Sequence, residues 1–151
     1  MKPNPEYIRK IQDIVGKAPF PKHMAMNLVE MDVGLAKIEL LLSTVHLQPF
    51  GLVHGGVIAT LIDTATFWAV FMSIPEDAGL VNVDLKLNYL RPVTHGRLHA
   101  QGRSIKEGKS LCYSEATVFN DHGTLLAHGT STLMVLPGKG LDVGVEKFLP
   151  E

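Results

Sequence analysis

The most apolar part of the chain is a run from Val57 to Met72 in which nearly every position is hydrophobic. This pattern predicts a helix, and a helix that is apolar on most faces must be enclosed by the rest of the fold. The segment SIPEDAG, residues 73–79, ends it with a proline and a glycine. Polar residues interrupt the run, and it is shorter than the roughly 20 apolar residues of a membrane span. We therefore interpret it as a core helix.

The segment that follows, residues 80–90, alternates between apolar and polar side chains and predicts a half-buried strand. The apolar positions, which we expect on one face, are Val81, Val83, Leu85, Leu87 and Tyr89. The polar positions, which we expect on the other face, are Asn82, Asp84, Lys86 and Asn88.

Shorter periodic segments lie on both sides of this helix and strand. Apolar residues at helical spacing predict an amphipathic helix over about residues 5–15, with Gly16 as its stop. Alternating segments separated by turn residues predict further strands, at residues 24–32, 35–47, 97–105, 110–119 and 124–136. From about residue 137 no such pattern remains, and we expect a loose tail.

The order of these elements predicts one domain over residues 1–151, of the α+β class. An antiparallel sheet that curves around the central helix is the economical way to enclose it. A chain of 151 residues is long enough for one core that buries roughly 70% of the surface of the unfolded form.

The charge balance excludes partners that need a strong electrostatic field. Lys and Arg number 14 and Asp and Glu 15, for a formal net charge of −1, so we expect neither nucleic acid nor an anionic membrane as a partner. Cys112 is the single cysteine, which rules out an internal disulfide and favours a reducing compartment. The first 17 residues carry charges and prolines where a signal peptide has an apolar segment. We therefore expect a cytoplasmic protein.

A glycine pair stands where a loop becomes the central helix, in the order His54, Gly55, Gly56. Backbone N–H groups in the first turn of a helix have no internal acceptor and carry partial positive charge. Glycine lets a substrate atom approach these groups closely. The pair is therefore a candidate site for an oxygen that gains negative charge during a reaction. Taken alone, it is more simply explained as a tight joint between loop and helix.

Asp63 makes a functional interpretation stronger, because burying an ionised carboxylate in an apolar helix is costly unless it is compensated. Thr60, Asp63 and Thr64 form one polar stripe, so the carboxylate is expected to face a cleft. The alternative is a carboxylate whose hydrogen bonds are satisfied by hydroxyls and amides of a neighbouring strand.

The spacing along the helix adds a constraint. Gly55 and Gly56 precede Asp63 by eight and seven residues, which corresponds to roughly 10 to 12 Å at the helical rise. The glycine pair and Asp63 of one helix cannot both touch the same reacting carbonyl, since each group must lie about 3 Å from its target. If both take part, Asp63 of one subunit faces the glycines of another, and we predict a two-fold homodimer with shared active sites.

Three stretches resemble the hotdog-fold acyl-CoA thioesterases, in particular the branch that includes the phenylacetate-pathway thioesterase. They are GLVHGGVIATLIDTA, VNVDLKLNYLRPV and GKSLCYSEATVFNDHGTLLAHGTSTLMV. The resemblance covers about residues 25–136, and its most specific motif is HGG with an acid nine residues after the histidine. It implies a long helix wrapped by an antiparallel sheet, a homodimer or a dimer of dimers (homotetramer), and an acyl-CoA substrate. It implies no cofactor other than the coenzyme A of the substrate.

The resemblance also implies roles for single residues. The N–H of Gly55 would polarise the thioester carbonyl, and Asp63 would act from the partner subunit as general base or nucleophile. Asn82 stands where the family often has a Ser or Thr that orients the attacking water, and an amide can also donate and accept hydrogen bonds. Gln48 stands where the family often has an asparagine. His54 is expected to support the loop through hydrogen bonds.

Coenzyme A carries phosphates, so basic residues are expected at the mouth of the site. Arg91, Lys106 and Lys109 lie at strand ends and at a hairpin turn, where they can meet such phosphates. By the resemblance, Thr130 and Ser131 lie where the last strand meets the nucleotide. Taken singly, each of these residues is also compatible with a solvated surface position.

Other chemistries have weaker support. A lipase-type hydrolase needs a G-x-S-x-G nucleophile in a parallel α/β sheet, and the chain has neither. His95 and His99 form a close pair, but no Cys or acid accompanies them at a metal-site spacing, so we expect no metal. Cys112 lies among apolar neighbours and is interpreted as a core thiol.

Two alternatives remain within the same fold: a domain that binds acyl-CoA without hydrolysing it, and a hydratase or dehydratase. Asp63 favours hydrolysis, because a mere binder gains nothing from an acid beside an acyl chain. The acyl group stays open between small aromatic and medium- or long-chain groups. The aromatic residues that could line its pocket or fill the core are Phe50, Phe67, Trp68, Phe71 and Tyr89.

Overall fold

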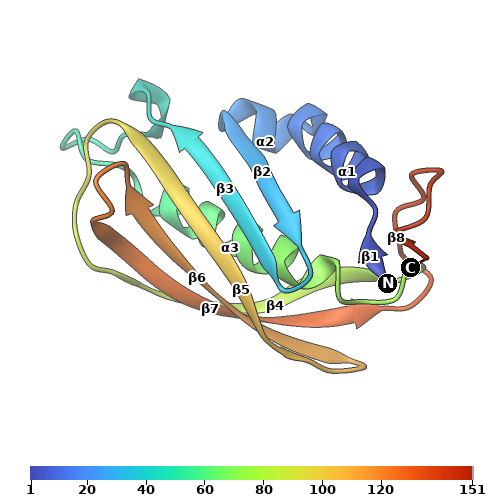
Figure 1. Cartoon of the computed structure of the whole chain (residues 1–151). Helices are drawn as coiled ribbons and strands as arrows, with labels where there is room; N and C mark the ends of the chain where they lie inside the picture. The colour runs from blue at the N-terminus through green and yellow to red at the C-terminus, as the bar shows by residue number, and fades with distance from the viewer. Residues whose placement is uncertain (151) are drawn as a thin grey trace.

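The computed structural model describes residues 1–150, in which a six-stranded antiparallel sheet curves around one long helix (Figure 1). The long helix is α3 (Gly55–Phe71). The strands of the sheet are β2 (Met26–Asp32), β3 (Leu35–Leu41), β4 (Gly79–Tyr89), β5 (Arg97–Glu107), β6 (Leu111–Asn120) and β7 (Leu125–Leu136). They lie in the order β2-β3-β5-β6-β7-β4. The predicted α+β class and the hotdog arrangement are confirmed.

One face of α3 packs closely on the sheet. Leu61, Ile62, Ala65 and Ala69 on this face are fully buried. Gly102 of β5 lies directly beneath them, and a Cβ at this position would stand 2.0 Å from the carbonyl oxygen of Ala65. Glycine at 102 therefore lets the helix rest on the sheet backbone. Any side chain here would displace α3 together with the residues that it positions.

The opposite face of α3 is not covered by the sheet. Half-exposed pairs recur every four residues along it, at 59–60, 63–64 and 67–68. Residues four apart lie on the same side of a helix, so these pairs form one continuous stripe. The predicted polar stripe of Thr60, Asp63 and Thr64 belongs to this open face.

β4 is an edge strand, and a bulge at Val83 changes which of its side chains face α3. Asn82 pairs with Leu133 of β7, and the ladder resumes only at Asp84. An unpaired residue in a bulge re-aims the side chains around it. The predicted alternation is therefore wrong across this point: Val83 is 52% exposed, whereas Asn82 faces α3, as Leu85 does.

Two short helices precede the sheet, and both pack against β2. Helix α1 (Pro5–Lys17) begins at Asn4, whose side chain accepts the N–H of Glu6 at 3.0 Å. Gly16, the predicted stop, lies within its last turn, and the helix ends just before Pro19. Helix α2 (Pro19–His23) follows, in a segment for which the sequence predicts no element. The strand expected over residues 35–47 ends at Leu41 and is followed by the short 3-10 helix η1 (Thr44–His46).

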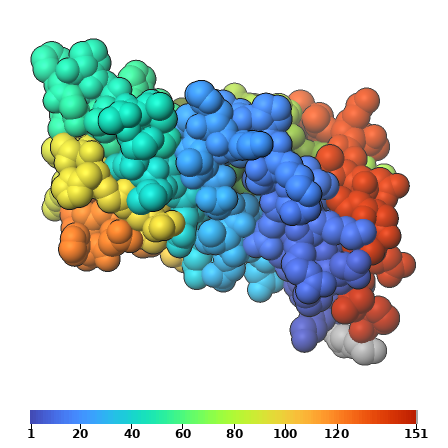
Figure 2. All heavy atoms as spheres, turned by 90° about the horizontal axis from the view of Figure 1, so that it is seen from above, coloured from blue at the N-terminus to red at the C-terminus, as the bar shows by residue number. Residues whose placement is uncertain are grey.

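The C-terminal segment is tied to the domain, so the expectation of a loose tail is wrong. Lys147 is 1% exposed, and its amine donates to the carbonyl of Phe71, the last residue of α3, and to that of Ile74 in the following loop, at 2.9 Å for Ile74. Burial lowers the pKa of Lys147 to about 8. Strand β8 (Phe148–Leu149) pairs with β1 (Lys2–Pro3), and Figure 2 shows the two ends of the chain side by side. A lysine in a polar segment is ordinarily a surface residue, and nothing in its sequence neighbourhood reveals carbonyl partners more than 70 residues away.

Candidate active site

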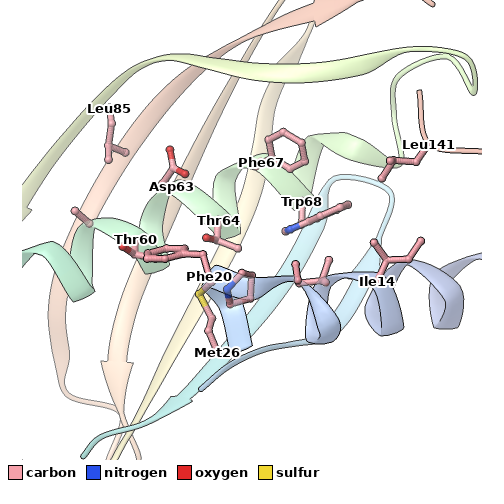
Figure 3. A pocket seen from close by; sticks show the side chains of 14 residues that line it. Ile14, Phe20, Met26, Thr60, Asp63, Thr64, Phe67, Trp68, Leu85 and Leu141 are labelled. Atoms are coloured by element: carbon pink, nitrogen blue, oxygen red, sulfur yellow. The ribbon is translucent and has the colours of Figure 1, made fainter. Parts of the chain in front are cut away.

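The open face of α3 forms one wall of an apolar groove of about 520 Å³ (Figure 3). The facing wall comes from the N-terminal part of the chain and includes Ile14, Phe20 and Met26. Leu85 and Leu141 complete the lining of the groove. Among the residues that line the groove, Asp63 is the single ionisable one. Its carboxylate therefore faces an apolar space.

Asp63 is half-buried and has one strong hydrogen bond. Asn82 Nδ2 donates to Asp63 Oδ1 at 2.7 Å, and the bulge in β4 is what turns Asn82 towards the helix. Burial raises the pKa of Asp63 above its ordinary value, and the hydrogen bond from Asn82 opposes this rise. The hydroxyl of Thr60 donates instead to the carbonyl of Gly56, at 2.8 Å. Within residues 1–150, the carboxylate thus has Asn82 as its side-chain partner and keeps acceptor capacity for a ligand.

The start of α3 is capped by His54, whose Nδ1 accepts the N–H of Gly56 at 2.8 Å. This contact agrees with a supporting role for His54. It also occupies the N–H of Gly56, so this residue does not offer the oxyanion site that the sequence suggests for it. Within the described part of the chain, the N–H of Gly55 donates to no acceptor. Gly55 is therefore the free donor at this helix terminus.

Gly55 lies in a second cavity of about 390 Å³, which is also lined by Gln48, Tyr89 and Arg91. The hydroxyl of Tyr89 donates to the carbonyl oxygen of Gly55 at 3.0 Å. The side-chain oxygen of Gln48 accepts the N–H of Phe50, which places Gln48 within a tight turn. The sequence predicts Tyr89 on the apolar face of a strand, either lining a pocket or filling the core. Its contact with Gly55 depends on how β4 passes the helix, which the sequence does not show.

One chain thus holds two separate parts of a site. Gly55 and Asp63 line different cavities, and eight residues of helix separate them by about 12 Å. Asn82 is hydrogen-bonded to Asp63, whereas Gln48 and Tyr89 line the cavity that contains Gly55. Neither part alone brings a donor and a carboxylate to one reacting carbonyl.

The residues expected to bind coenzyme A are dispersed. Arg91 lies in the Gly55 cavity and donates to the carbonyl of Leu125 at 3.0 Å. Lys106 and Lys109 lie at the β5–β6 turn, beside the other end of α3, since Glu107 there accepts a hydrogen bond from Ser73 at 2.6 Å. Within one chain, the lysines and Arg91 are therefore at opposite ends of the helix.

Ser131 is fully buried and donates to the carbonyl of Asp84 at 2.9 Å. The expectation that it meets a nucleotide is wrong, because alternate residues of a strand face opposite sides and Ser131 faces the core. Thr130 pairs with Lys86 and Glu115 and lies on the outer side of the sheet.

The five aromatic candidates fall into four groups. Phe67 and Trp68 line the groove, and their ring centroids are 5.0 Å apart in an edge-to-face arrangement. Phe71 is buried in the core, and Phe50 is 91% exposed. Of the five candidates, only Phe67 and Trp68 line the groove that contains Asp63, while Tyr89 lines the other cavity.

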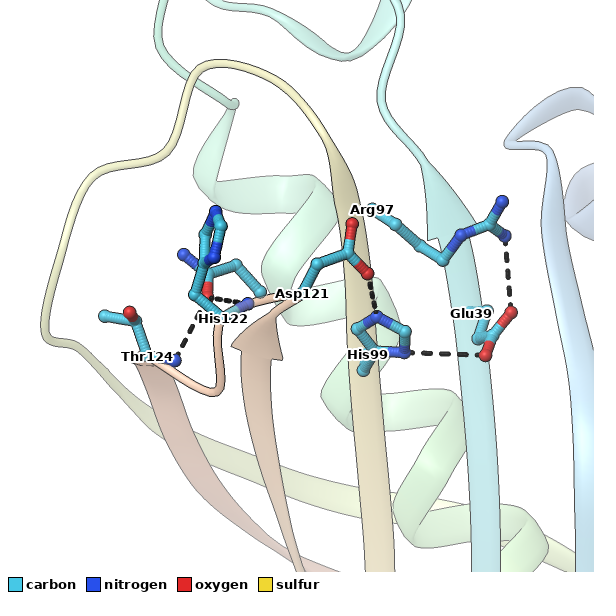
Figure 4. Close-up of polar contacts among 7 residues, drawn as sticks. Glu39, Arg97, His99, Asp121, His122 and Thr124 are labelled. Carbon is cyan, nitrogen blue, oxygen red and sulfur yellow. Dashed lines mark hydrogen bonds and ion pairs between the residues drawn. The ribbon is translucent and has the colours of Figure 1, made fainter.

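His95 and His99, the close pair in the sequence, have different partners and do not contact the same group. His99 lies between two carboxylates on the outer face of the sheet, with Nε2 2.6 Å from Asp121 and Nδ1 3.5 Å from Glu39 (Figure 4). His95 contacts the hydroxyl of Thr94 instead, at 2.8 Å. Residues 1–150 contain no group of His, Cys, Asp and Glu side chains arranged to hold a metal ion.

Cys112 is 1% exposed, and burial raises the pKa of its thiol, so it is a core residue.

In the described part of the chain, no helix has both the length and the apolar character needed to cross a membrane.

Comparison with known proteins defines the class. The family model described as Thioesterase superfamily matches residues 50–127, just over half of the chain. The chain therefore belongs to the thioesterase superfamily, and its chemistry is that of a thioester hydrolase. The matched residues include Gly55, Asp63 and Asn82 but exclude α1, α2 and the C-terminal segment.

Individual relatives agree with this class. The chain is 28% identical to the proofreading thioesterase EntH of Klebsiella pneumoniae over 101 residues, which cover 67% of this chain and 74% of EntH. It is 26% identical to acyl-coenzyme A thioesterase 13 of Mus musculus over 129 residues, covering 83% of this chain and 91% of that protein. A solved thioesterase structure from Haemophilus influenzae superposes with a TM-score of 0.79 at 21% identity and covers 89% of this chain and 92% of its own.

Proposed function

We propose that the protein hydrolyses acyl-CoA thioesters to a free acid and coenzyme A in an active site shared by two subunits. The observation that carries this proposal is Asp63, a half-buried carboxylate in an apolar groove with a raised pKa and one side-chain partner. Perturbed carboxylates of this kind are typical of catalytic sites. The 83% coverage of this chain by the match to an acyl-coenzyme A thioesterase supports the substrate class.

In the proposed reaction, a water molecule attacks the thioester carbonyl carbon while the partner subunit's Asp63 accepts its proton. The N–H of Gly55 stabilises the negative charge that develops on the carbonyl oxygen. The C–S bond then breaks, and the coenzyme A thiolate leaves and takes up a proton. Direct attack by the carboxylate, followed by hydrolysis of the resulting anhydride, uses the same geometry. Asn82 would hold the carboxylate, and Gln48 would orient the water or the carboxylate.

The proposed dimer follows from the separation of the two parts. β4 lies at an edge of the sheet and exposes Val81 and Val83. A long edge strand with unpaired backbone groups favours pairing with a second chain. Pairing across a two-fold axis repeats every contact, so two complete sites would form per dimer. Assembly of two such dimers stays a prediction.

The groove favours an apolar acyl group, either aromatic or a medium to long chain, because Phe20, Phe67 and Trp68 line it. Arg91, in the Gly55 cavity, is the proposed partner of a coenzyme A phosphate. Lys106 and Lys109 lie at the opposite end of α3 from Arg91 in one chain, so we propose that their contact with the same coenzyme A comes from another subunit. Thr130 stays a candidate on the outer side of the sheet.

A panel of acyl-CoAs tests the proposal directly. Release of free thiol is measured with acetyl-, hexanoyl-, decanoyl-, palmitoyl-, benzoyl- and phenylacetyl-CoA. We expect kcat/KM to be lowest for acetyl-CoA, because it leaves the groove empty, and to rise by about fourfold for each further methylene that is buried. Absence of hydrolysis for every member, with measurable binding, would instead identify a non-catalytic acyl-CoA-binding domain.

Replacing Asn82 by alanine is expected to change the pH dependence of hydrolysis. The hydrogen bond from Asn82 lowers the pKa of Asp63, and its loss raises that pKa further. Because the proposed reaction needs the ionised carboxylate, the acidic limb of the kcat/KM profile moves to higher pH, and activity on that limb falls several-fold.

Asn88→Ala provides the matched control, since Asn88 lies on the same strand and is exposed. Its profile should superimpose on that of the wild type. A uniform loss of activity in Asn82→Ala at every pH would contradict the electrostatic role of Asn82.

A further inference from the structure

The groove has two ends of different construction. Thr60 and Asp63 lie towards one end, and Leu141 lies beyond Phe67 and Trp68 at the other (Figure 3). Trp68 follows Asp63 by five residues of helix, which corresponds to about 7.5 Å along the groove. An acyl chain whose carbonyl is held near Asp63 therefore extends along Phe67 and Trp68 towards Leu141.

Leu141 belongs to the segment 137–147, here called the strap, which connects β7 to the buried Lys147. The strap is fixed on both sides of Leu141. The N–H of Gly140 donates to the carbonyl of Asp77 at 2.9 Å, and Lys10 Nζ of α1 donates to the carbonyl of Val143 at 2.9 Å. These bonds hold Leu141 as a fixed part of the wall.

Beyond Leu141 lies a third cavity of about 400 Å³, separate from the groove and from the cavity of Gly55. It lies between the strap and the loop that follows α3. Leu141 lines this space as well as the groove. Val143 and Val145 contribute apolar surface to it, and Glu76, Asp77 and Asp142 line its remaining side. The side chain of Leu141 thus separates the groove from this cavity.

We propose that Leu141 sets the upper limit on the length of the acyl chain that the groove accepts. This inference rests on the proposed function, since it concerns the same site. Removal of the side chain beyond Cβ joins the groove to the space under the strap, and a larger side chain shortens the groove. Leu141 is partly exposed, so a change here disturbs the core little.

Hydrolysis of straight-chain acyl-CoAs from butyryl to palmitoyl tests this role. In the wild type we expect kcat/KM to rise with chain length and then level off at the length that reaches Leu141. In Leu141→Ala it should continue to rise beyond that length, by about fourfold for each further methylene that is buried. Leu141→Trp should level off earlier. The control Leu149→Ala, at a similarly exposed position of β8 outside the groove, should give the wild-type profile.

A binding measurement separates this inference from the proposed function. Trp68 is the single tryptophan of the chain and lines the groove, so its fluorescence reports occupancy without any reaction. Straight-chain fatty acids of increasing length are titrated into the Asp63→Asn protein with and without Leu141→Ala. Affinity that continues to rise with length only when Leu141 is shortened supports the inference. Affinity that levels off at the same length in both proteins overturns it, whether or not the wild type hydrolyses acyl-CoA.

Discussion

Replacement of Asp63 by asparagine is expected to lower kcat for acyl-CoA hydrolysis by about 10²- to 10⁴-fold, the usual contribution of a general base. The amide keeps the shape of the side chain and can still accept the hydrogen bond from Asn82. What it loses is the negative charge that accepts a proton from water or attacks the carbonyl. Release of free thiol under single-turnover conditions measures the effect on the chemical step.

The same variant should not lose stability. The folded state raises the pKa of Asp63, so the folded protein binds this proton more tightly than the unfolded chain does. The stabilising contribution of the group is present at low pH and is lost as the pH rises through the folded-state pKa. At neutral pH the ionised carboxylate therefore costs stability, and asparagine removes this cost.

We expect the unfolding temperature of Asp63→Asn to equal or exceed that of the wild type. Asp13→Asn is the matched control, because it removes a carboxylate from the exposed surface of α1 and should leave kcat unchanged. Wild-type turnover by Asp63→Asn would reject the proposed mechanism, and unfolding of the variant would show a structural role instead.

Replacement of Gly55 by proline is expected to lower kcat by about 10²- to 10³-fold, because it removes a single oxyanion donor. Gly55 is the first residue of α3, a position where proline is well tolerated. His54 before it has φ −65° and ψ 135°, which is compatible with a following proline. Gly55→Ala is the control: its Cβ meets the same hydroxyl of Tyr89, but it keeps the N–H. Equal activity of the two variants would show that steric contact, and not the donor, matters.

The two inactive variants together test the shared site. In a heterodimer of Asp63→Asn and Gly55→Pro chains, one of the two sites combines an intact Asp63 with an intact Gly55. Random association of co-expressed chains should therefore restore about a quarter of the wild-type activity, since half of the dimers are mixed. If each chain held a complete site of its own, mixing would restore none.

The central helix and the candidate residues on it were predictable because their signals are local. The apolar run, the glycine pair at its start and the stripe around Asp63 follow from residues close in sequence, and spacing alone separates Gly55 from Asp63. The hairpin turns between β5, β6 and β7 were equally visible, because turn residues interrupt alternating segments.

The features that the sequence did not reveal depend on contacts between distant segments. Asn82 faces Asp63 because of a bulge at Val83, which is decided by the pairing of β4 with β7. The pairing of β7 with β4 also turns Ser131 towards the core. Its neighbours Thr130 and Thr132 are equally small and polar, so these three residues alone do not show which side chain faces inwards. Lys147 is buried because two carbonyls at the end of α3 receive its amine, and a single lysine carries no pattern that shows this.

The groove joins residues inside and outside the part of the chain that the superfamily model matches. The wall that carries Asp63 lies on α3, within the matched residues 50–127, whereas Phe20 and Leu141 come from segments outside them. Under the proposed function, mutations near the two ends of the chain are expected to alter which acyl groups are accepted and to leave Gly55 and Asp63 in place. The proposed choice of substrate and the proposed reaction would then depend on different segments of the chain.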